Sequence, residues 1–403
     1  MKPSLHRAGP ARYLVPFVAA LIGIGPLSID AYLPALPAMA AALGSDIAAA
    51  NVTVSTYLVG YAVGQLFGGP ISDQIGRMRV AIGGLALFTV ASLVIVLAGS
   101  MAQVQVLRAV QAVGGGFATV VAMAMIRDSY PPAEAARRYP LVMLILLGAP
   151  LFAPAIGAGL LHVGWESIFV LLAIYAVVIA VLFPLVGETV KETVRWPRLG
   201  AIVPQYLAVL THRVGGRLLP LRYVFTQGLV TAVTMIFITN SAFIYLEHYA
   251  VGSDRFVLYF GANIVVMMAF SFATSRLVGR VAPFVLFRTG RAVQFVMLLA
   301  LTLLVLWDDP PTRWFTPMLA LGIGASGMIG PSVSALYLSM FDRLAGSASS
   351  LLATASFVFG GFLGAVSSYL HDGTLRPAML TMLGAVVIAN LVALGIPRPV
   401  ADH

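Results

Sequence analysis

The chain has 403 residues, of which 60% are apolar and only 10% are charged. Soluble globular domains are about half apolar and roughly a quarter charged, so this composition excludes a soluble fold and indicates that lipid surrounds most of the chain. The net charge of +9 does not indicate nucleic-acid binding, because the basic residues lie between the apolar segments. The sequence contains no cysteine, which excludes disulfides, thiol chemistry and thiolate metal sites.

Apolar segments long enough for a helix to cross a hydrocarbon core of ~30 Å recur along the whole chain. Because they are continuous rather than alternating, they favour a helical bundle over a β-barrel. Residues 1–40 also resemble a secretory signal peptide, but their apolar core is long and many spans follow. The predicted spans are 13–36, 52–72, 79–98, 103–125, 139–161, 167–187, 220–246, 255–275, 281–306, 314–338, 346–369 and 377–396.

The basic residues predict how these spans are oriented. Of the 24 Lys and Arg residues, only Arg255, Arg313 and Arg376 fall in odd-numbered loops, and Arg108 lies within a span. All the others fall in the N-terminus, in the even-numbered loops and the span ends that adjoin them, or in the C-terminal tail. Because basic loops stay on the cytoplasmic side of a membrane, the sequence predicts that both termini are cytoplasmic.

The longest polar stretch, residues 188–219, divides the chain in two and is rich in Lys, Arg and Pro. We expect an N-terminal six-helix bundle over residues 1–187, a cytoplasmic linker, and a C-terminal six-helix bundle over residues 220–403. Two halves of six spans are typical of transporters built from repeats. The predicted fold class is therefore an all-α integral membrane protein with 12 transmembrane helices in two pseudo-symmetric bundles.

The first span ends in the stretch SIDAYLPALP, which places Asp30 after an almost purely apolar run. One interpretation is that this carboxylate marks the outer end of the span and reaches water. Against it, apolar residues continue for two more turns, and Pro34 and Pro37 are expected to kink or end the helix beside a cavity. Burial favours a protonated acid and a nearby arginine favours the carboxylate, so Asp30 is a candidate for changing its protonation as a cavity opens and closes.

The second span carries Gly60, Gly64 and Gly68 on one helical face, and Gly360 and Gly364 have a similar spacing in the eleventh. Small residues at this spacing allow two helices to approach closely. Ordinary packing explains them, and in a transporter the same faces would also slide or rock. The sequence does not separate these two uses.

The loop between the second and third spans combines a turn with opposite charges. Asp73 ends one span, Arg77 and Arg79 begin the next, and Gly69 and Gly76 flank the carboxylate. A carboxylate at a helix end beside arginines forms charge-assisted hydrogen bonds that hold two helices in one orientation. These five residues are predicted to take part in conformational gating.

This loop resembles the G-x-x-x-D-x-x-G-R-[KR] motif of the major facilitator superfamily over residues 69–77. It departs from the family pattern at Gln74, where Arg is frequent, and at Met78, where a second basic residue is usual. Arg79 is the candidate to replace that missing charge.

The fourth span places Arg108 about five residues inside the membrane, with Gln111 one helical turn further on. An arginine in hydrocarbon costs at least ~2.5–3.5 kcal/mol on insertion scales. It either extends to the outer surface or faces the interior of the bundle. The stretch resembles the R-x-x-Q-G motif of proton-coupled facilitators, with Ala112 in place of glycine.

The fifth span contains Pro150, Pro154 and Gly157, which predict a thin, kinked helix with a role in gating. It resembles the G-x-x-x-G-P-x-x-G-G motif of antiporters in the superfamily. Ala153 and Ala158 stand where the motif has glycine.

Taken with these motifs, the phrase D-x-Y-L-P-A-L-P at residues 30–37 resembles the drug:proton antiporters of the bicyclomycin/chloramphenicol-resistance group of that superfamily. The segments SALYLSMFDRLAGSASSLL and YLHDGT in the second half also resemble that group. The resemblance covers essentially the full chain. It implies a facilitator fold whose two halves rock about a central cavity, a monomer, and a location in the bacterial inner membrane.

Polar side chains within the spans are the candidates for substrate binding. Three of them share one stripe of the second span by their i, i+4, i+8 spacing, although a tyrosine such as Tyr57 can also be an interfacial anchor. Asn240 can instead serve only to hydrogen-bond a neighbouring helix. The candidates are Tyr32, Tyr57, Tyr61, Gln65, Gln111, Asn240 and Asn263.

The sequence thus predicts a proton-coupled secondary transporter that exports small amphiphilic or neutral organic compounds by alternating access. Asp30 and Arg108 form the expected proton-coupling pair: protonation of Asp30 on the outside weakens the pairing and releases substrate. The alternative is an exporter of a cellular metabolite, such as an amino acid or a purine, and a nutrient symporter is less favoured because of the fifth-span motif.

A polytopic membrane enzyme is the alternative from another class. It would need a nucleophile, a metal cluster or a phosphate-binding loop, but the six histidines are scattered without metal-ligand spacing. Gly114, Gly115 and Gly116 lie inside a span and do not form a phosphate loop. We therefore expect no catalytic residue, cofactor, metal or nucleic-acid partner. The expected partners are a small-molecule substrate, protons and the lipid bilayer.

Overall fold

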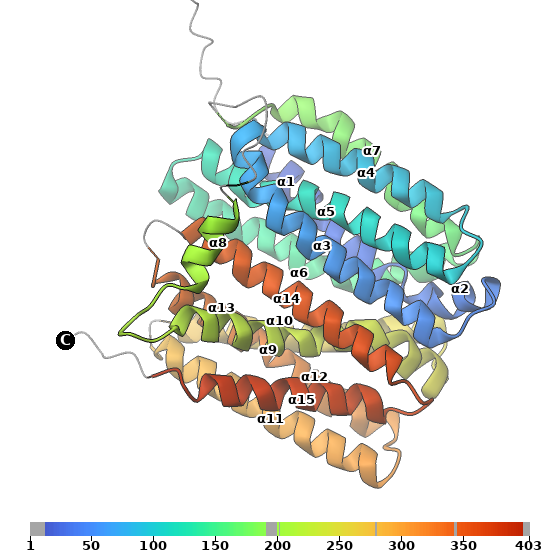
Figure 1. The fold of residues 1–403 in the computed structure, drawn as a ribbon. Helices are drawn as coiled ribbons and strands as arrows, with labels where there is room; N and C mark the ends of the chain where they lie inside the picture. The colour runs from blue at the N-terminus through green and yellow to red at the C-terminus, as the bar shows by residue number, and fades with distance from the viewer. Residues whose placement is uncertain (1–12, 191–199, 201, 279, 342–344, 398–403) are drawn as a thin grey trace, which may run out of the picture.

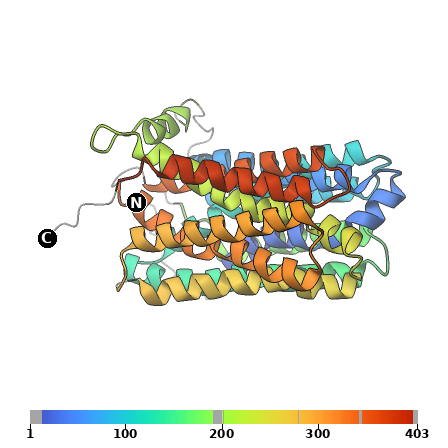
Figure 2. The same ribbon diagram turned by 90° about the horizontal axis from the view of Figure 1, so that it is seen from below.

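The computed structural model describes residues 13–190, 200, 202–278, 280–341 and 345–397. These residues form a bundle of long helices whose axes run in roughly one direction (Figure 1, Figure 2). One end of the bundle carries α8 (Ile202–Leu210) and both described ends of the chain, and we call it the terminal face. The opposite end carries α2 (Leu36–Ala42) and is called the far face.

The helices divide into those before and those after α8. The first group consists of α1 (Leu14–Asp30), η1 (Leu33–Ala35), α2 (Leu36–Ala42), α3 (Ile47–Ile75), α4 (Arg77–Ile95), α5 (Met101–Ser129), α6 (Pro132–Leu160) and α7 (Glu166–Val186). The second consists of α9 (Leu219–Ala242), η3 (Phe243–His248), α10 (Ser253–Leu277), α11 (Pro283–Trp307), α12 (Thr312–Gly324), α13 (Ser326–Leu338), α14 (Ala345–Tyr369) and α15 (Arg376–Ala393).

Every predicted span coincides with one long helix or with consecutive helices. Within the described residues, eleven helices are long and apolar enough to cross a membrane, and α6, with 29 residues, provides the twelfth crossing. The fold class predicted from the sequence is confirmed. Two spans are divided, because the first breaks after Asp30 into η1 and α2, and the tenth is interrupted at Ala325 between α12 and α13.

Each group of helices packs mainly within itself. In the first group α3 and α4 both pack against α5, and α1 packs against α6. In the second, α9 packs against α14 and α15, while α10 and α11 pack against α12 and α13. The two groups meet where α14 lies along α3 and where α10 lies along α6 (Figure 1).

The glycines of α3 explain its close packing on α5. A Cβ at Gly60 would lie 2.3 Å from the carbonyl oxygen of Ala109, and one at Gly64 would lie 2.4 Å from that of Val113. No side chain fits at either place, so glycine is required for the two backbones to touch. The packing role predicted for this glycine face is confirmed.

The charged loop between α3 and α4 is built around Arg77. Gly76 has a φ of 109°, a left-handed conformation that favours glycine and turns the chain from one helix into the next. Arg77 is buried, forms an ion pair with Asp73, and donates from Nε to Asp128 Oδ2 at 3.0 Å. Arg79 is exposed and makes no ion pair with any described residue, so it does not replace the second basic residue of the motif.

A carboxylate from the segment that follows α7 completes this loop instead. Glu188 accepts hydrogen bonds from the backbone nitrogens of Arg77 at 2.9 Å and Met78 at 3.0 Å, at the first residues of α4. Helix N-termini have unpaired N–H groups and a partial positive charge, and a carboxylate satisfies both.

We expect Glu188→Ala to lower the free energy of unfolding by about 1 kcal/mol, the usual cost of losing an N-terminal cap. Glu188→Gln retains an acceptor oxygen and should cost less. Thermal unfolding of the detergent-purified variants measures both effects. Equal melting temperatures for wild type and Glu188→Ala would contradict this role.

The short helix α8 lies within the stretch predicted to link the two halves. The hydroxyl of Tyr206 donates a hydrogen bond of 2.9 Å to the carbonyl of Leu66 in α3. Burial raises the pKa of Tyr206 to about 12, so this hydroxyl keeps its proton at neutral pH. The linker is therefore attached to α3 at the terminal face. Residues 191–199 and 201, also part of the predicted linker, lie outside the described residues.

Candidate functional site

Asp30 is the last residue of α1 and is only 3% exposed. Beyond it the chain turns into η1, where Pro34 occupies the second position, and the predicted end of the helix before the prolines is confirmed. Among the residues that the structure describes, none forms a hydrogen bond with Oδ1 of Asp30. A buried carboxyl oxygen without a partner is costly, so a proton or another cation would stabilise it.

Helix α6 holds the chain in place directly after Asp30. A Cβ at Gly157 would lie 1.5 Å from the carbonyl oxygen of Ala31, so only glycine allows α6 to come this near. The helix continues without interruption through Pro150 and Pro154. The gating roles expected of these prolines and of Gly157 stay predictions.

Arg108 lies at the centre of a buried hydrogen-bond network. Its Nη1 donates to Oε1 of Gln111 at 2.5 Å, and its Nη2 donates to the carbonyl of Ser28 in α1 at 2.9 Å. Nε2 of Gln111 donates in turn to Oγ of Ser92 in α4 at 2.6 Å. Arg108 has no exposed surface, which confirms that it faces the interior. The network joins α1, α5 and α4 around one guanidinium.

Three aromatic rings surround the same guanidinium. Its central carbon lies 4.4 Å from the ring centre of Tyr32, 4.1 Å from that of Tyr57 and 5.8 Å from that of Phe169. Such cation–π contacts are worth ~2 kcal/mol or more when desolvated. The hydroxyl of Tyr32 shares a hydrogen bond with Thr53 of α3, which fixes one of the rings.

The expected pairing of Asp30 with Arg108 is not present in this conformation. No ion pair joins the two side chains, although both belong to the described part of the chain. The guanidinium is instead occupied by the Ser28 carbonyl, by Gln111 and by the aromatic rings. Because an amide oxygen and π faces replace a carboxylate here, Asp30 is left without a counter-ion.

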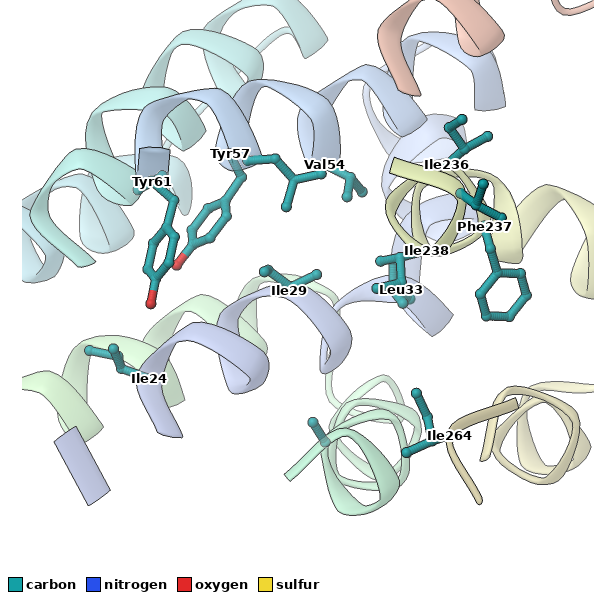
Figure 3. Close-up of a cluster of buried hydrophobic side chains, with 14 of the residues drawn as sticks. Ile24, Ile29, Leu33, Val54, Tyr57, Tyr61, Ile236, Phe237, Ile238 and Ile264 are labelled. Atoms are coloured by element: carbon teal, nitrogen blue, oxygen red, sulfur yellow. The ribbon is translucent and has the colours of Figure 1, made fainter. Parts of the chain in front are cut away.

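The polar stripe of α3 extends this site toward the terminal face. Tyr57 is fully buried, which excludes the interfacial anchor considered from the sequence. Its ring stacks on that of Tyr61, with ring centres 6.0 Å apart (Figure 3). The Tyr61 hydroxyl lies 2.7 Å from Oγ1 of Thr119. Gln65 follows one turn later and has no hydrogen-bond partner for Oε1 within the described residues. The shared helical stripe is therefore confirmed.

The two asparagines of the second group take no part in the described hydrogen bonds of Arg108. Nδ2 of Asn240 donates to the Ile236 carbonyl at 2.8 Å and to Oγ of Ser367 in α14 at 3.1 Å, so it joins α9 to α14. Nδ2 of Asn263 donates to the Tyr259 carbonyl at 2.9 Å. The contacts of Asn240 fit its interpretation as a helix-packing residue, and substrate binding by either asparagine stays a prediction.

Apolar side chains surround the polar cluster where the two groups of helices approach each other. Leu33 of η1 lies near Ile238 of α9, and Ile29 points from α1 toward α3, the helix that carries Tyr57 (Figure 3). Tyr61 also makes an edge contact with Phe357 of α14, with ring centres 5.0 Å apart. This lining is suited to amphiphilic or neutral molecules more than to strongly charged ones.

Glycines of α14 allow it to lie against α3. A Cβ at Gly361 would come within 2.7 Å of Cγ2 of Val59 and 2.9 Å of the Ser55 carbonyl. Overpacking a tight contact costs roughly 1–3 kcal/mol, so Gly361→Val should shift the protein toward conformations in which these helices separate. Spin labels on cysteines introduced at Ala42 and Asp254, near the far face of either group, should report a changed distance distribution.

The matched control is Gly346→Val, on the same helix, where a Cβ meets nothing within 4 Å. This control should leave the distances unchanged. Identical distributions for Gly361→Val and wild type would show that the α3–α14 contact does not control the conformational equilibrium. The native chain has no cysteine, so the labels report only the introduced sites.

Several contributors to the site were missed in the sequence. Ser92 ends the hydrogen-bond chain, Phe169 forms one wall around Arg108, and Glu188 and Asp128 complete the charged loop. Asp128 follows Arg127 near a helix end and could have been found by its charge. Ser92 and Phe169 lie in ordinary apolar spans and carry no local signal. Within the described ranges, no three His, Asp or Glu side chains gather as metal ligands would.

Twelve membrane crossings around a buried polar network define a polytopic membrane transporter. The sequence model of the protein family "Major Facilitator Superfamily" matches residues 18–365, so the chain belongs to this family.

Comparison with individual proteins agrees with this assignment. The chain is 29% identical to a bicyclomycin resistance protein homolog of Haemophilus influenzae over 372 residues, covering 91% of either chain. It is 28% identical to a chloramphenicol resistance protein of Pseudomonas aeruginosa, covering 91% of this chain and 86% of that one. The structure resembles that of a D-xylose-proton symporter with a TM-score of 0.72 at 16% identity, covering 95% and 97% of the two chains. The family resemblance inferred from the motifs is confirmed.

Proposed function

We propose that this protein is a proton-coupled antiporter that exports small amphiphilic or neutral organic compounds from the bacterial cytoplasm. The observation that carries the proposal is the buried carboxyl of Asp30, the last residue of α1, which has no ion-pair partner among the described residues. The names of the relatives, which refer to resistance against bicyclomycin and chloramphenicol, support export of drug-like molecules.

In this mechanism Asp30 takes up a proton from the outside and releases it to the cytoplasm. Each proton that enters contributes ~2.3 kcal/mol per 100 mV of membrane potential. Arg108, which is held here by Gln111 and Ser28, carries the positive charge that Asp30 would approach when the helices rearrange. That charge favours loss of the proton when the site opens to the cytoplasm.

Residues 1–187 and 220–403 are proposed as the two halves that rock about the site, as a monomer. The contacts of α14 with α3 and of α10 with α6 would open at one face of the bundle while they close at the other. The loop around Arg77 lies near α14, because a Cβ at Gly69 would be 3.9 Å from Oγ of Ser350. Rearrangement of Asp73 and Arg77 would then accompany each opening at the terminal face.

The terminal face is proposed to be cytoplasmic, with the protein in the inner membrane. Both described chain ends lie at that face (Figure 1), and the distribution of Lys and Arg in the sequence favours this side. Labelling a cysteine introduced into the α8 segment with an impermeant reagent tests this orientation, and efficient labelling in intact cells would contradict it.

A resistance profile of cells overexpressing the chain tests the function as a whole. Chloramphenicol, bicyclomycin and lipophilic dyes are the first compounds to measure, with and without an uncoupler. We expect raised tolerance that the uncoupler removes. Unchanged tolerance to every drug, combined with loss of an amino acid or purine from the cells, would indicate a metabolite exporter instead.

A further inference from the structure

A lateral hollow on the membrane side of the second helix group is separate from the site around Arg108. It has a volume of about 510 Å³ and lies between α9, α14 and α15. Its walls are almost wholly apolar, with Leu229 and Leu363 at the deep end and Leu370 toward the far face. Leu370 and Ile388 are about half exposed, so the hollow is open to the lipid.

The length of the hollow corresponds to one membrane leaflet. Along α15 its lining extends from Arg376 to Ile388, which at 1.5 Å per residue is ~18 Å of helix. Half of a hydrocarbon core is ~15 Å thick. The hollow therefore reaches from the far-face surface of the membrane to about its middle, the depth occupied by one acyl chain.

Two opposite charges stand at the rim of the hollow. Arg376, the first residue of α15, is exposed and forms no ion pair with any described residue. Asp372 lies four residues before Arg376, in the loop between α14 and α15. Both residues line the hollow. Tyr369, three residues before Asp372 in the chain, is 88% exposed, and exposed tyrosines are typical of the membrane–water interface.

The carboxylate at this rim is held in a charged form. Oδ1 of Asp372 accepts hydrogen bonds from Oγ1 of Thr374 at 2.6 Å and from its backbone nitrogen at 2.9 Å. These hydrogen bonds lower the pKa of Asp372 below its usual range. The rim of the hollow therefore carries a fixed anion and a guanidinium that forms no ion pair with a described residue.

We propose that this hollow binds a phosphatidylethanolamine molecule from the leaflet at the far face. One acyl chain fills the apolar groove, the phosphate binds the guanidinium of Arg376, and the ammonium group binds the carboxylate of Asp372. A phosphatidylglycerol headgroup has no cation for Asp372. The quaternary amine of phosphatidylcholine cannot donate a hydrogen bond to it.

Gly384 provides a way to close the groove without disturbing the bundle. It lies in the wall of the hollow, and a Cβ there meets nothing within 4 Å. Gly384→Phe should therefore place a ring in the space of the acyl chain. Gly83→Phe on α4 is the matched control, because Gly83 is exposed, also has open space around its Cβ, and lies outside the hollow.

The purified full chain is incubated with phosphatidylethanolamine, phosphatidylcholine or phosphatidylglycerol, all with identical acyl chains. Native mass spectrometry then measures the fraction of the protein that retains a bound lipid. We expect wild type and Gly83→Phe to retain phosphatidylethanolamine at least fivefold more than phosphatidylcholine or phosphatidylglycerol. Gly384→Phe should retain all three equally and weakly. Asp372→Asn and Arg376→Gln, which alter only exposed side chains, should each remove most of the preference.

Equal retention of the three lipids by wild type would overturn the proposal. So would a preference that survives both Gly384→Phe and the two rim variants. A dimer of the wild-type chain that Gly384→Phe dissociates would assign the groove to a second copy of the protein and would also overturn it. Should Gly384→Phe not fold, the rim variants alone decide, because neither touches the packing of the helices.

Discussion

Asp30→Asn is expected to reduce proton-driven efflux to the level of membranes that lack the protein. Asparagine has nearly the shape of aspartate but does not exchange a proton, so coupling is lost while the end of α1 keeps its packing. Because Oδ1 of Asp30 has no partner among the described residues, the substitution breaks no internal hydrogen bond at that atom. Everted vesicles energised by a pH gradient, with a drug from the resistance profile, measure the effect.

Asp254→Asn is the control, since Asp254 is an exposed carboxylate at the start of α10. It should transport as wild type does. The Asp30→Asn protein should still reach the membrane and should unfold at a temperature close to that of wild type. Undiminished efflux by a folded Asp30→Asn protein would refute the coupling role of this carboxyl.

Arg108→Lys is expected to lower transport by one to two orders of magnitude although the charge is kept. The guanidinium donates at once to Gln111 and to the Ser28 carbonyl while its faces contact Tyr32 and Tyr57. A lysine ammonium is a compact point charge and does not reproduce that planar geometry. Hydrogen bonds of a charged group contribute about 1.5–3 kcal/mol each, so losing one accounts for a change of this size.

Arg127→Lys is the matched control on the same helix. The side chain of Arg127 is 58% exposed and lies 3.6 Å from Asp128, so the exchange should leave transport within a factor of two. Initial rates in everted vesicles, normalised to the amount of folded protein, compare the two variants. Wild-type rates for Arg108→Lys would mean that a positive charge alone is sufficient and that the aromatic enclosure is not needed.

Much of the fold follows from local sequence. The hydrocarbon core needs about 20 apolar residues per crossing, so continuous apolar runs identified the spans directly. The glycine spacing in α3 predicted its contact with α5, because residues four apart share one helical face. Gly76 and its flanking charges likewise identified the loop that joins α3 to α4.

The partners of the buried polar groups did not follow from local sequence. Asp30 and Arg108 were expected to pair because both are ionisable residues in largely apolar spans, but this placement does not determine the rotation of each helix about its axis. The structure places the Ser28 carbonyl and three aromatic rings at the guanidinium. The carbonyl belongs to α1, and the rings belong to the turn before η1, to α3 and to α7. Such a set depends on how four elements are rotated and packed together.

The sequence by itself determined that lipid is the solvent of this protein, how many times the chain crosses it, and which residues carry charge inside it. These properties are local, because each depends on the composition of one segment or on the spacing within one helix. Only the tertiary structure decided that, among the described residues, the buried arginine is hydrogen-bonded without an acid and the buried acid has no ion-pair partner. The reason is that hydrogen bonds between helices depend on distances between residues far apart in the chain, such as Ser28 and Arg108.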